Sequence, residues 1–165
     1  MTSKQATYSI LPSTTIPVPR VHEIKRDENG AQVISMDYMP GTRLDKAWPS
    51  MTGQQKTTLA QELHDYIQQL RDLEADYIGA AERGKPIIGK YVFHLDGPFD
   101  NERQFHQFLF SRSLDTVPDR LRYFATSSFK EDHEIVFTHG DLAPRNILVD
   151  EDGHVRAVLN WENAG

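Results

Sequence analysis

The strongest pattern in the chain is a run of apolar residues at three- and four-residue spacing between residues 52 and 74. Residues with this spacing share one face of an α-helix and can pack together against a core. The stripe consists of Leu59, Leu63, Ile67, Leu70 and Leu73. Thr52 is followed three residues later by Gln55, which predicts a capping box at the start of the helix. Packing is the expected role of this helix.

Two β-hairpins are predicted, one near each end of the chain. Residues 21–24 and 31–38 are rich in β-forming side chains, and the Asn-Gly pair at 29–30 supplies the positive φ angles of a tight turn. Residues 147–149 and 155–159 flank a second turn that reads Glu-Asp-Gly. Each pair is expected to form antiparallel strands.

Shorter segments connect these elements. Residues 101–112 and 118–125 predict helices, and residues 135–137 predict a short buried strand. Residues 76–98 are rich in glycine and proline over a length typical of loops that line binding sites. The prolines within residues 15–20 favour an extended arm, because each disfavours helix in the residue before it. Together the pattern predicts an α+β fold.

Composition narrows the possible partners and locations. A chain of 165 residues is near the usual size of one domain. Its net charge of -6 opposes the phosphate backbone, so nucleic acid is not an expected partner. The absence of cysteine excludes disulfides and thiolate metal sites. No apolar run suits a signal peptide or a membrane span, so we predict a cytoplasmic protein with no membrane partner.

The most informative segment covers residues 137–149, which read FTHGDLAPRNILV. It places an acid and an amide on a loop between two apolar strands. Asp141 and Asn146 are separated by a turn that contains Pro144, so they can converge on one point. A carboxylate that orients a substrate hydroxyl and an amide that binds a metal are parts of a kinase catalytic loop. For His139 two roles stay open, a proton shuttle and a structural partner of the loop backbone.

This loop resembles the catalytic core of the aminoglycoside-phosphotransferase family, a branch of the kinase fold. The resemblance lies in His-Gly-Asp, in the Asn five residues after the Asp, and in the following hairpin and Asp-Trp-Glu-like segment. Fungal members are similar at three further segments, which read IPVP at 16–19, MDYMPG at 36–41 and GPFD at 97–100. The resemblance implies a partial kinase-like fold with an N-terminal hairpin, a helical middle, a catalytic loop and a C-terminal hairpin. It also implies a small-molecule substrate.

The resemblance also implies roles for individual residues. Asp141 corresponds to the catalytic carboxylate, with His139 beside it, and Asn146 corresponds to a magnesium ligand. The family's next metal-binding Asp falls at Asn160, and Glu162 could complete the same polar pocket. The hinge that holds an adenine corresponds to Met36, Asp37, Tyr38 and Met39. Magnesium and ATP are therefore the implied cofactors.

The chain departs from the family pattern at the metal position. Asn160 offers a neutral amide where a carboxylate is expected. The lost charge is worth about 4 kcal/mol per charge pair at ~4 Å under an effective dielectric of 20. We therefore expect magnesium and ATP to bind weakly.

The family's glycine-rich loop and strand lysine lie upstream of the IPVP segment, and its closing helices follow the metal segment. Fifteen residues precede Ile16 here, and the printed sequence stops at Gly165. The sequence is thus interpreted as a single domain truncated at both ends. We divide it into an arm at 1–15, a hairpin and hinge-like segment at 16–40, and a partial C-lobe at 41–165.

Several functions stay open at this stage. The favoured one is a phosphotransferase-like remnant without efficient ATP-dependent kinase activity. An acid-base catalyst, of isomerase or cyclase type, could use His139, Asp141, Asn146 and Glu162 on a natural product. A non-catalytic module that binds a small molecule or a protein is a third, and a truncated gene product a fourth. We also predict a homo-oligomer, because missing segments would uncover apolar area on the 135–159 strands and the 59–73 helix.

Overall fold

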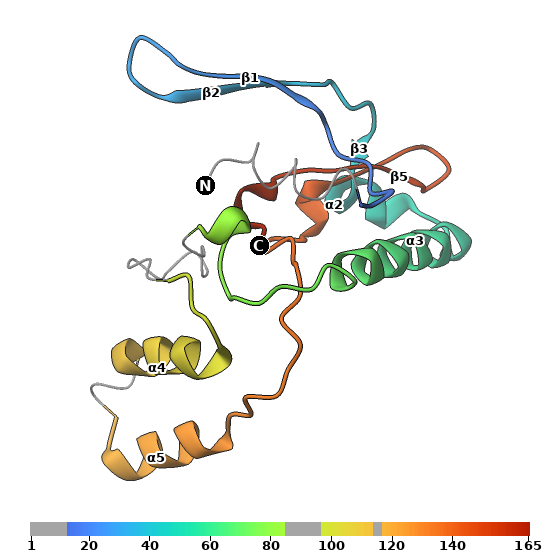
Figure 1. The fold of residues 1–165 in the computed structure, drawn as a ribbon. Coiled ribbons are helices and arrows are strands. Elements are labelled where there is room, and N and C mark those ends of the chain that lie inside the picture. The colour runs from blue at the N-terminus through green and yellow to red at the C-terminus, as the bar shows by residue number, and fades with distance from the viewer. Residues whose placement is uncertain (1–12, 85–96, 114–116) are drawn as a thin grey trace.

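The computed structural model describes residues 13–84, 97–113 and 117–165. Its strands form two separate antiparallel sheets (Figure 1). The first pairs β1 (Val21–Arg26) with β2 (Gln32–Met36). The second has the order β3-β4-β5 and consists of Thr42–Arg43, Ile147–Val149 and Val155–Val158.

Both predicted hairpins are confirmed. The sequence did not indicate β3, because two residues are too few to carry an alternating pattern.

The helices divide into one long element and several short ones. Helix α3 (Gly53–Arg71) has the predicted capping box, in which the Thr52 N–H donates to Gln55 Oε1 at 2.8 Å and the Gln55 N–H donates to Thr52 Oγ1 at 3.2 Å. The remaining α-helices are α2 (Leu44–Ala47), α4 (Glu102–Ser113) and α5 (Asp119–Ser128), and the 3-10 turns are η1 (Trp48–Ser50), η2 (Ala81–Arg83), η3 (Pro144–Asn146) and η4 (Trp161–Asn163).

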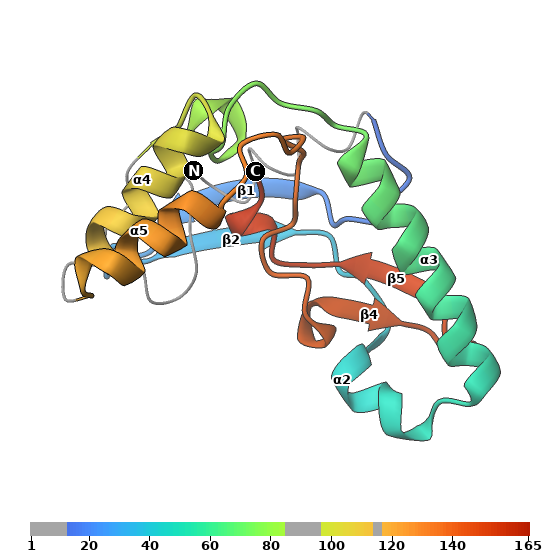
Figure 2. The ribbon, with the colours of Figure 1, turned by 90° about the horizontal axis from the view of Figure 1, so that it is seen from below.

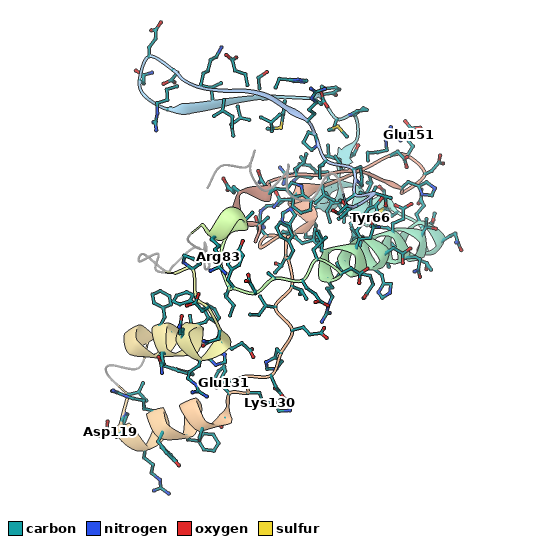
Figure 3. The ribbon with its side chains drawn as sticks, in the orientation of Figure 1. Tyr66, Arg83, Asp119, Lys130, Glu131 and Glu151 are labelled. Atoms are coloured by element: carbon teal, nitrogen blue, oxygen red, sulfur yellow. The ribbon has the colours of Figure 1, made fainter. Side chains whose placement is uncertain are left out.

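The core lies between α3 and the second sheet, which run side by side in Figures 1 and 2. Leu59 of α3, Val149 of β4 and Val158 of β5 are each at most 2% exposed. The segment just before β1 also contributes, since Ile16 is buried in the same cluster and the Val158 N–H donates to the Pro17 carbonyl at 2.8 Å. Tyr66 packs against this core from α3 (Figure 3). This packing fixes the sheet that carries the catalytic loop.

The turn between β4 and β5 is clamped onto the start of α3. The Gln55 side-chain amide donates to the carbonyl of Glu151 at 2.8 Å, and Figure 3 shows Glu151 above this end of the helix. The Glu62 carboxylate accepts from the Val155 N–H at 2.7 Å and bonds to the His154 ring. One helix therefore holds both the buried face and the outer turn of the hairpin.

Three sequence expectations are corrected by the structure. The β1–β2 connection is not a tight two-residue turn, because Arg26 pairs with Gln32 and the residues between them form a longer loop. Gly30 has a positive φ of 80°, whereas Asn29 does not. The Asp27 carboxylate closes the loop by accepting from the N–H groups of Asn29 and Ala31.

Residues 135–137 are half-buried and form no strand; Val136 makes an isolated bridge to Glu74.

The apolar exposure also differs from the expectation. The apolar residues of β4 and β5 and residues Leu59 and Leu70 of α3 are buried within the chain, while Ile67 is 37% exposed. Larger exposures occur on and after α5, at Leu121, Tyr123, Phe124 and Phe129. Helices α4 and α5 lie side by side away from the core (Figures 1 and 2), with the Phe110 and Phe129 rings 5.0 Å apart. Self-association stays a prediction, and the exposed apolar residues of α5 are now the expected contact surface.

The predicted binding loop at 76–98 is described only in part. Residues 85–96 lie outside the described residues, and residues 76–84 form η2 and its flanking turns. Within the described part of the chain, no helix has both the length and the apolar character needed to cross a bilayer.

Candidate active site: the catalytic loop

The predicted catalytic loop leaves the half-buried segment at 135–137 and enters β4 through η3. Gly140 has a φ of 74°, and a Cβ added there would collide with the backbone carbonyl of Asn163. Thr138 and Gly165 exchange two backbone hydrogen bonds, at 2.8 and 3.0 Å. The loop is therefore held tightly against η4, and only glycine suits this close approach.

His139 is built into the support of the loop. Its side chain belongs to a residue only 2% exposed, and its ring lies 4.4 Å from that of Trp161. Nε2 faces the Leu159 carbonyl at 2.9 Å and so carries the proton, whereas Nδ1 accepts from the Asp141 N–H at 3.1 Å. Burial lowers the pKa of His139, which favours the neutral ring. Both ring nitrogens are engaged in positioning the backbone.

Asp141 and Asn146 converge as the sequence predicts. The Asn146 side-chain nitrogen donates to Asp141 Oδ2 and to the Asp141 carbonyl, each at 2.8 Å. Arg145 Nη2 donates to both carboxylate oxygens, at 2.6 and 2.8 Å. The hydrogen bond from Asn146, together with Arg145, holds the pKa of the Asp141 carboxyl below its usual range. The ionised form of the carboxylate is therefore favoured, and three hydrogen bonds hold it in place.

A chain of side-chain hydrogen bonds continues from Asp141 to Asn160. Because Asn146 turns its NH₂ toward the Asp141 carboxylate, its oxygen Oδ1 faces the other way. The Asn160 side-chain nitrogen donates to this oxygen at 2.9 Å. Asn160 has a φ of 64°, a left-handed conformation that Asn tolerates better than most residues. An N–H group thus occupies the place next to Asn146 Oδ1.

The oxygen atoms of Asp141 and Asn146 do not form a site that fits a magnesium ion. Magnesium prefers six oxygen ligands in an octahedral arrangement, with carboxylates among them. Here Asn146 Oδ1 accepts from Asn160, and both Asp141 oxygens accept from Arg145. Across residues 13–84, 97–113 and 117–165, no group of three or more His, Asp or Glu side chains could hold a metal. The Asn160 N–H faces Asn146 Oδ1 at the position where the resemblance predicts a magnesium ligand.

The other predicted site residues are not bonded to this cluster. Glu162 lies on η4 and is exposed. In the hinge-like segment, Tyr38 is 89% and Met36 43% exposed. Asp37 accepts from the Arg20 N–H at 3.1 Å and pairs with the His22 ring at 2.7 Å. Adenine binding by Met36, Asp37, Tyr38 and Met39 stays a prediction.

Arg145 is the site residue that the sequence interpretation missed. It stands four residues after Asp141, and η3 turns the chain so that both side chains meet. The only signal in the sequence was an acidic and a basic residue four positions apart, and η3 covers only Pro144–Asn146, so the ion pair depends on the path of the whole loop. It was overlooked because the family resemblance gives Arg145 no role.

A cleft of about 830 Å³ adjoins the loop on another side. Its walls consist of residues 73–81, residues 135–138, Gly140, Asn163 and Gly165. Asp141, Arg145 and Asn146 are not among them. The cleft therefore lies beside the loop and is not lined by these three residues.

The sequence that contains this loop matches a protein-family model. Residues 4–165 match the model of the phosphotransferase enzyme family. The chain belongs to this family. A curated relative, clavilactone A biosynthesis cluster protein Y of Ampulloclitocybe clavipes, is 27% identical over 184 aligned positions, which cover 91% of this chain and 46% of the relative.

Solved phosphotransferase structures share the fold. Aminoglycoside phosphotransferase APH(4)-Ia superimposes with a TM-score of 0.63 at 16% identity, covering 98% of this chain and 54% of that protein. A thermostable mutant of the same enzyme, in a ternary complex with AMP-PNP and hygromycin B, gives 0.61 at 14% identity, covering 98% and 55%. The GDP complex of aminoglycoside 2'-phosphotransferase-IIIa gives 0.59 at 13% identity, again covering 98% and 55%.

These matches establish a kinase-like fold, and the chain spans about half the length of the family members it matches.

Proposed function

We propose that the chain is a small-molecule-binding phosphotransferase-family protein that lacks efficient magnesium-dependent ATP turnover. The hydrogen bond from Asn160 to Asn146 Oδ1 carries this proposal, because it replaces a cation and its carboxylate ligand with a neutral amide pair. Phosphoryl transfer depends on positioning and charge neutralisation, and the magnesium ion supplies much of the latter. In this sense the chain is a pseudokinase.

Small-molecule binding is supported by the survival of the acceptor side of the site. Asp141 is ionised, held by three hydrogen bonds and partly exposed, as a group that receives a substrate hydroxyl must be. Relatives bind small molecules at this fold, as the complex with AMP-PNP and hygromycin B illustrates. We assign Asp141 to the contact with the bound molecule and His139 to positioning.

The acid-base alternative needs a second catalytic group besides Asp141, and His139 is not available for this role. A proton shuttle needs a ring nitrogen that can reach the ligand, and both nitrogens of His139 are bonded to the backbone. One variant distinguishes the binding-module alternative. If Asp141 is catalytic, Asp141→Asn should abolish any activity that the protein has. If the variant keeps full activity, Asp141 is not catalytic and the protein is better described as a binding module.

The metal position is tested by Asn160→Asp. The substitution removes the N–H donor and sets a carboxylate against Asn146 Oδ1, so a cation becomes favourable there. We expect magnesium affinity, measured by calorimetry, to rise about tenfold or more. Asn29→Asp in the β1–β2 loop adds the same charge far from the site and should leave the affinity unchanged.

The same proteins are assayed for ATP turnover. The wild-type chain is expected to show no magnesium-dependent turnover near the kinase range of about 1 to 100 per second. Turnover in that range by the wild type, or tight magnesium binding that Asn160→Asp does not improve, would contradict the proposal.

A further inference from the structure

The inference starts from the ion pair at the reactive carboxylate. Arg145 Nη2 lies 2.6 Å from Asp141 Oδ1 and 2.8 Å from Oδ2, so a single nitrogen bridges both oxygens. The Arg145 side chain is 56% exposed and that of Asp141 is 29% exposed. The pair lies at the surface of the loop, where a ligand can reach either partner.

The ion pair leaves Asp141 little capacity for a ligand. With the bond from Asn146 to Oδ2, three of roughly four acceptor positions on the carboxylate are filled. A ligand hydroxyl must therefore compete with the guanidinium for this group. Movement of Arg145 is the simplest way to open the carboxylate, because Asn146 is buried and fixed by Asn160.

Arg145 retains unused donors. Among the residues that the structure describes, its only hydrogen-bond partner is Asp141, and Nε and Nη1 take no part in that contact. A guanidinium has a planar, forked set of donors that matches a carboxylate or phosphate group. The charges of Arg145 and Asp141 also cancel, so the loop presents no net negative charge to a polycation.

We propose that Arg145 binds an anionic group, a carboxylate or a phosphate, on the hydroxyl-bearing ligand of this site, and that this group draws the guanidinium away from Asp141. The ligand's hydroxyl then takes the place on the carboxylate that Arg145 leaves. Arg145 thus selects hydroxy-anions over polyamines such as aminoglycosides. This inference rests on the proposed function in one respect, that the Asp141 loop binds a small molecule.

Calorimetry with defined probes tests the proposal. Glycerate carries a carboxylate and glycerol 3-phosphate a phosphate, whereas glycerol carries only hydroxyls and hygromycin B is a polyamine. At about 0.15 M salt, where the Debye length is about 8 Å, long-range attraction is screened. We expect one or both anions to bind the wild type, and the stronger of the two identifies the group. Glycerol and hygromycin B should bind more weakly.

Two variants separate a specific contact from loss of charge. Arg145→Gln should weaken anion binding about tenfold or more, since charge-assisted hydrogen bonds are among the stronger polar contacts. Arg43→Gln is the matched control: Arg43 is 50% exposed and also donates to both oxygens of one carboxylate, from Nε and Nη2 to Asp45. It should leave anion affinity unchanged. Far-UV circular dichroism checks that both variants are folded.

Asp141→Asn gives an effect of opposite sign. Removing the competing carboxylate frees Arg145, so anion affinity should rise by about fivefold or more. A merely structural ion pair would lose stability in both variants without moving affinity in opposite directions. The proposal is overturned if neither anion binds, if Arg145→Gln and Arg43→Gln behave alike, or if hygromycin B binds more tightly than both anions.

A separate measurement, ATP turnover, tests the proposed function. ATP turnover by the wild type would contradict the pseudokinase assignment and would leave the dependence of anion binding on Arg145 as measured.

Discussion

The two sheets of this protein are both antiparallel and built from short strands, yet their surroundings differ sharply. In the β3–β4–β5 sheet, Ile147, Val149 and Val158 are at most 2% exposed and pack against α3. In the β1–β2 hairpin, Val33 is 40% exposed and Val21 is the buried member of β1. The catalytic loop is therefore supported by its own core, whereas the hairpin before the hinge-like segment depends on its ladder and its closing loop.

This difference bears on function because each sheet leads into one side of the expected kinase site. The acceptor side, with Asp141 and Asn146, is ordered by packing and by a continuous hydrogen-bond chain. The predicted hinge, at Met36 and Tyr38, exposes apolar surface among the described residues. The loop around Asp141 is thus the more firmly supported of the two regions.

The largest effect is expected from two glycines with similar backbone conformations. Gly140 and Gly30 have φ values of 74° and 80°. A Cβ at Gly140 collides with the Asn163 backbone, whereas one at Gly30 meets nothing within 4 Å. Gly140→Ala should therefore lower the free energy of unfolding by about 3 kcal/mol or more, and Gly30→Ala by about 1 kcal/mol. Urea denaturation measures both, and equal losses would contradict the contrast between the two regions.

A smaller difference is expected between two valines. Val149→Ala removes buried methyl groups and leaves a cavity, so it should cost about 2 kcal/mol. Val33→Ala on the exposed hairpin should cost less than about 0.5 kcal/mol. The same denaturation series provides both values. If Val33 proves as costly as Val149, the hairpin is packed against something in solution, and self-association should then be measured by sedimentation.

The smallest expected effect is a pH dependence of the clamp on α3. The hydrogen bond with Glu62 raises the pKa of His154 above its unfolded value of about 6.5. Its stabilisation is then fully present below about pH 6.5 and is lost as pH rises through the folded-state value. The difference in free energy of unfolding between the wild type and His154→Gln should therefore shrink as the pH rises above about 6.5.

Glu62→Gln is the control for this pH dependence. It retains an acceptor for the Val155 N–H but removes the charge that stabilises the protonated ring. The pH dependence due to His154 should be reduced in this background. A dependence of the opposite sign would show that another group dominates this range.

The sequence predicted the elements whose signals are local. The α3 stripe, its Thr52 cap and both hairpins follow from spacing and turn residues that act over a few positions. Convergence of Asp141 and Asn146 was likewise predicted, because a short loop joins them.

Contacts between distant segments could not be predicted in the same way. The buried setting of His139 depends on Leu159 and Trp161, and the role of Asn160 depends on the direction in which Asn146 points. Residues 135–137 have the composition of a strand, but their neighbour offers only an isolated bridge at Glu74. These features arise from tertiary pairing, on which single-residue preferences carry little information.

The contact between Gln55 and Glu151 joins residues 96 positions apart, and Pro17 meets Val158 across an even longer stretch. Closing such loops costs entropy before any burial compensates for it, which slows folding relative to proteins with local contacts. During synthesis α3 leaves the ribosome long before β4 and β5 exist. Its apolar stripe therefore stays exposed until β4 and β5 emerge and complete the core.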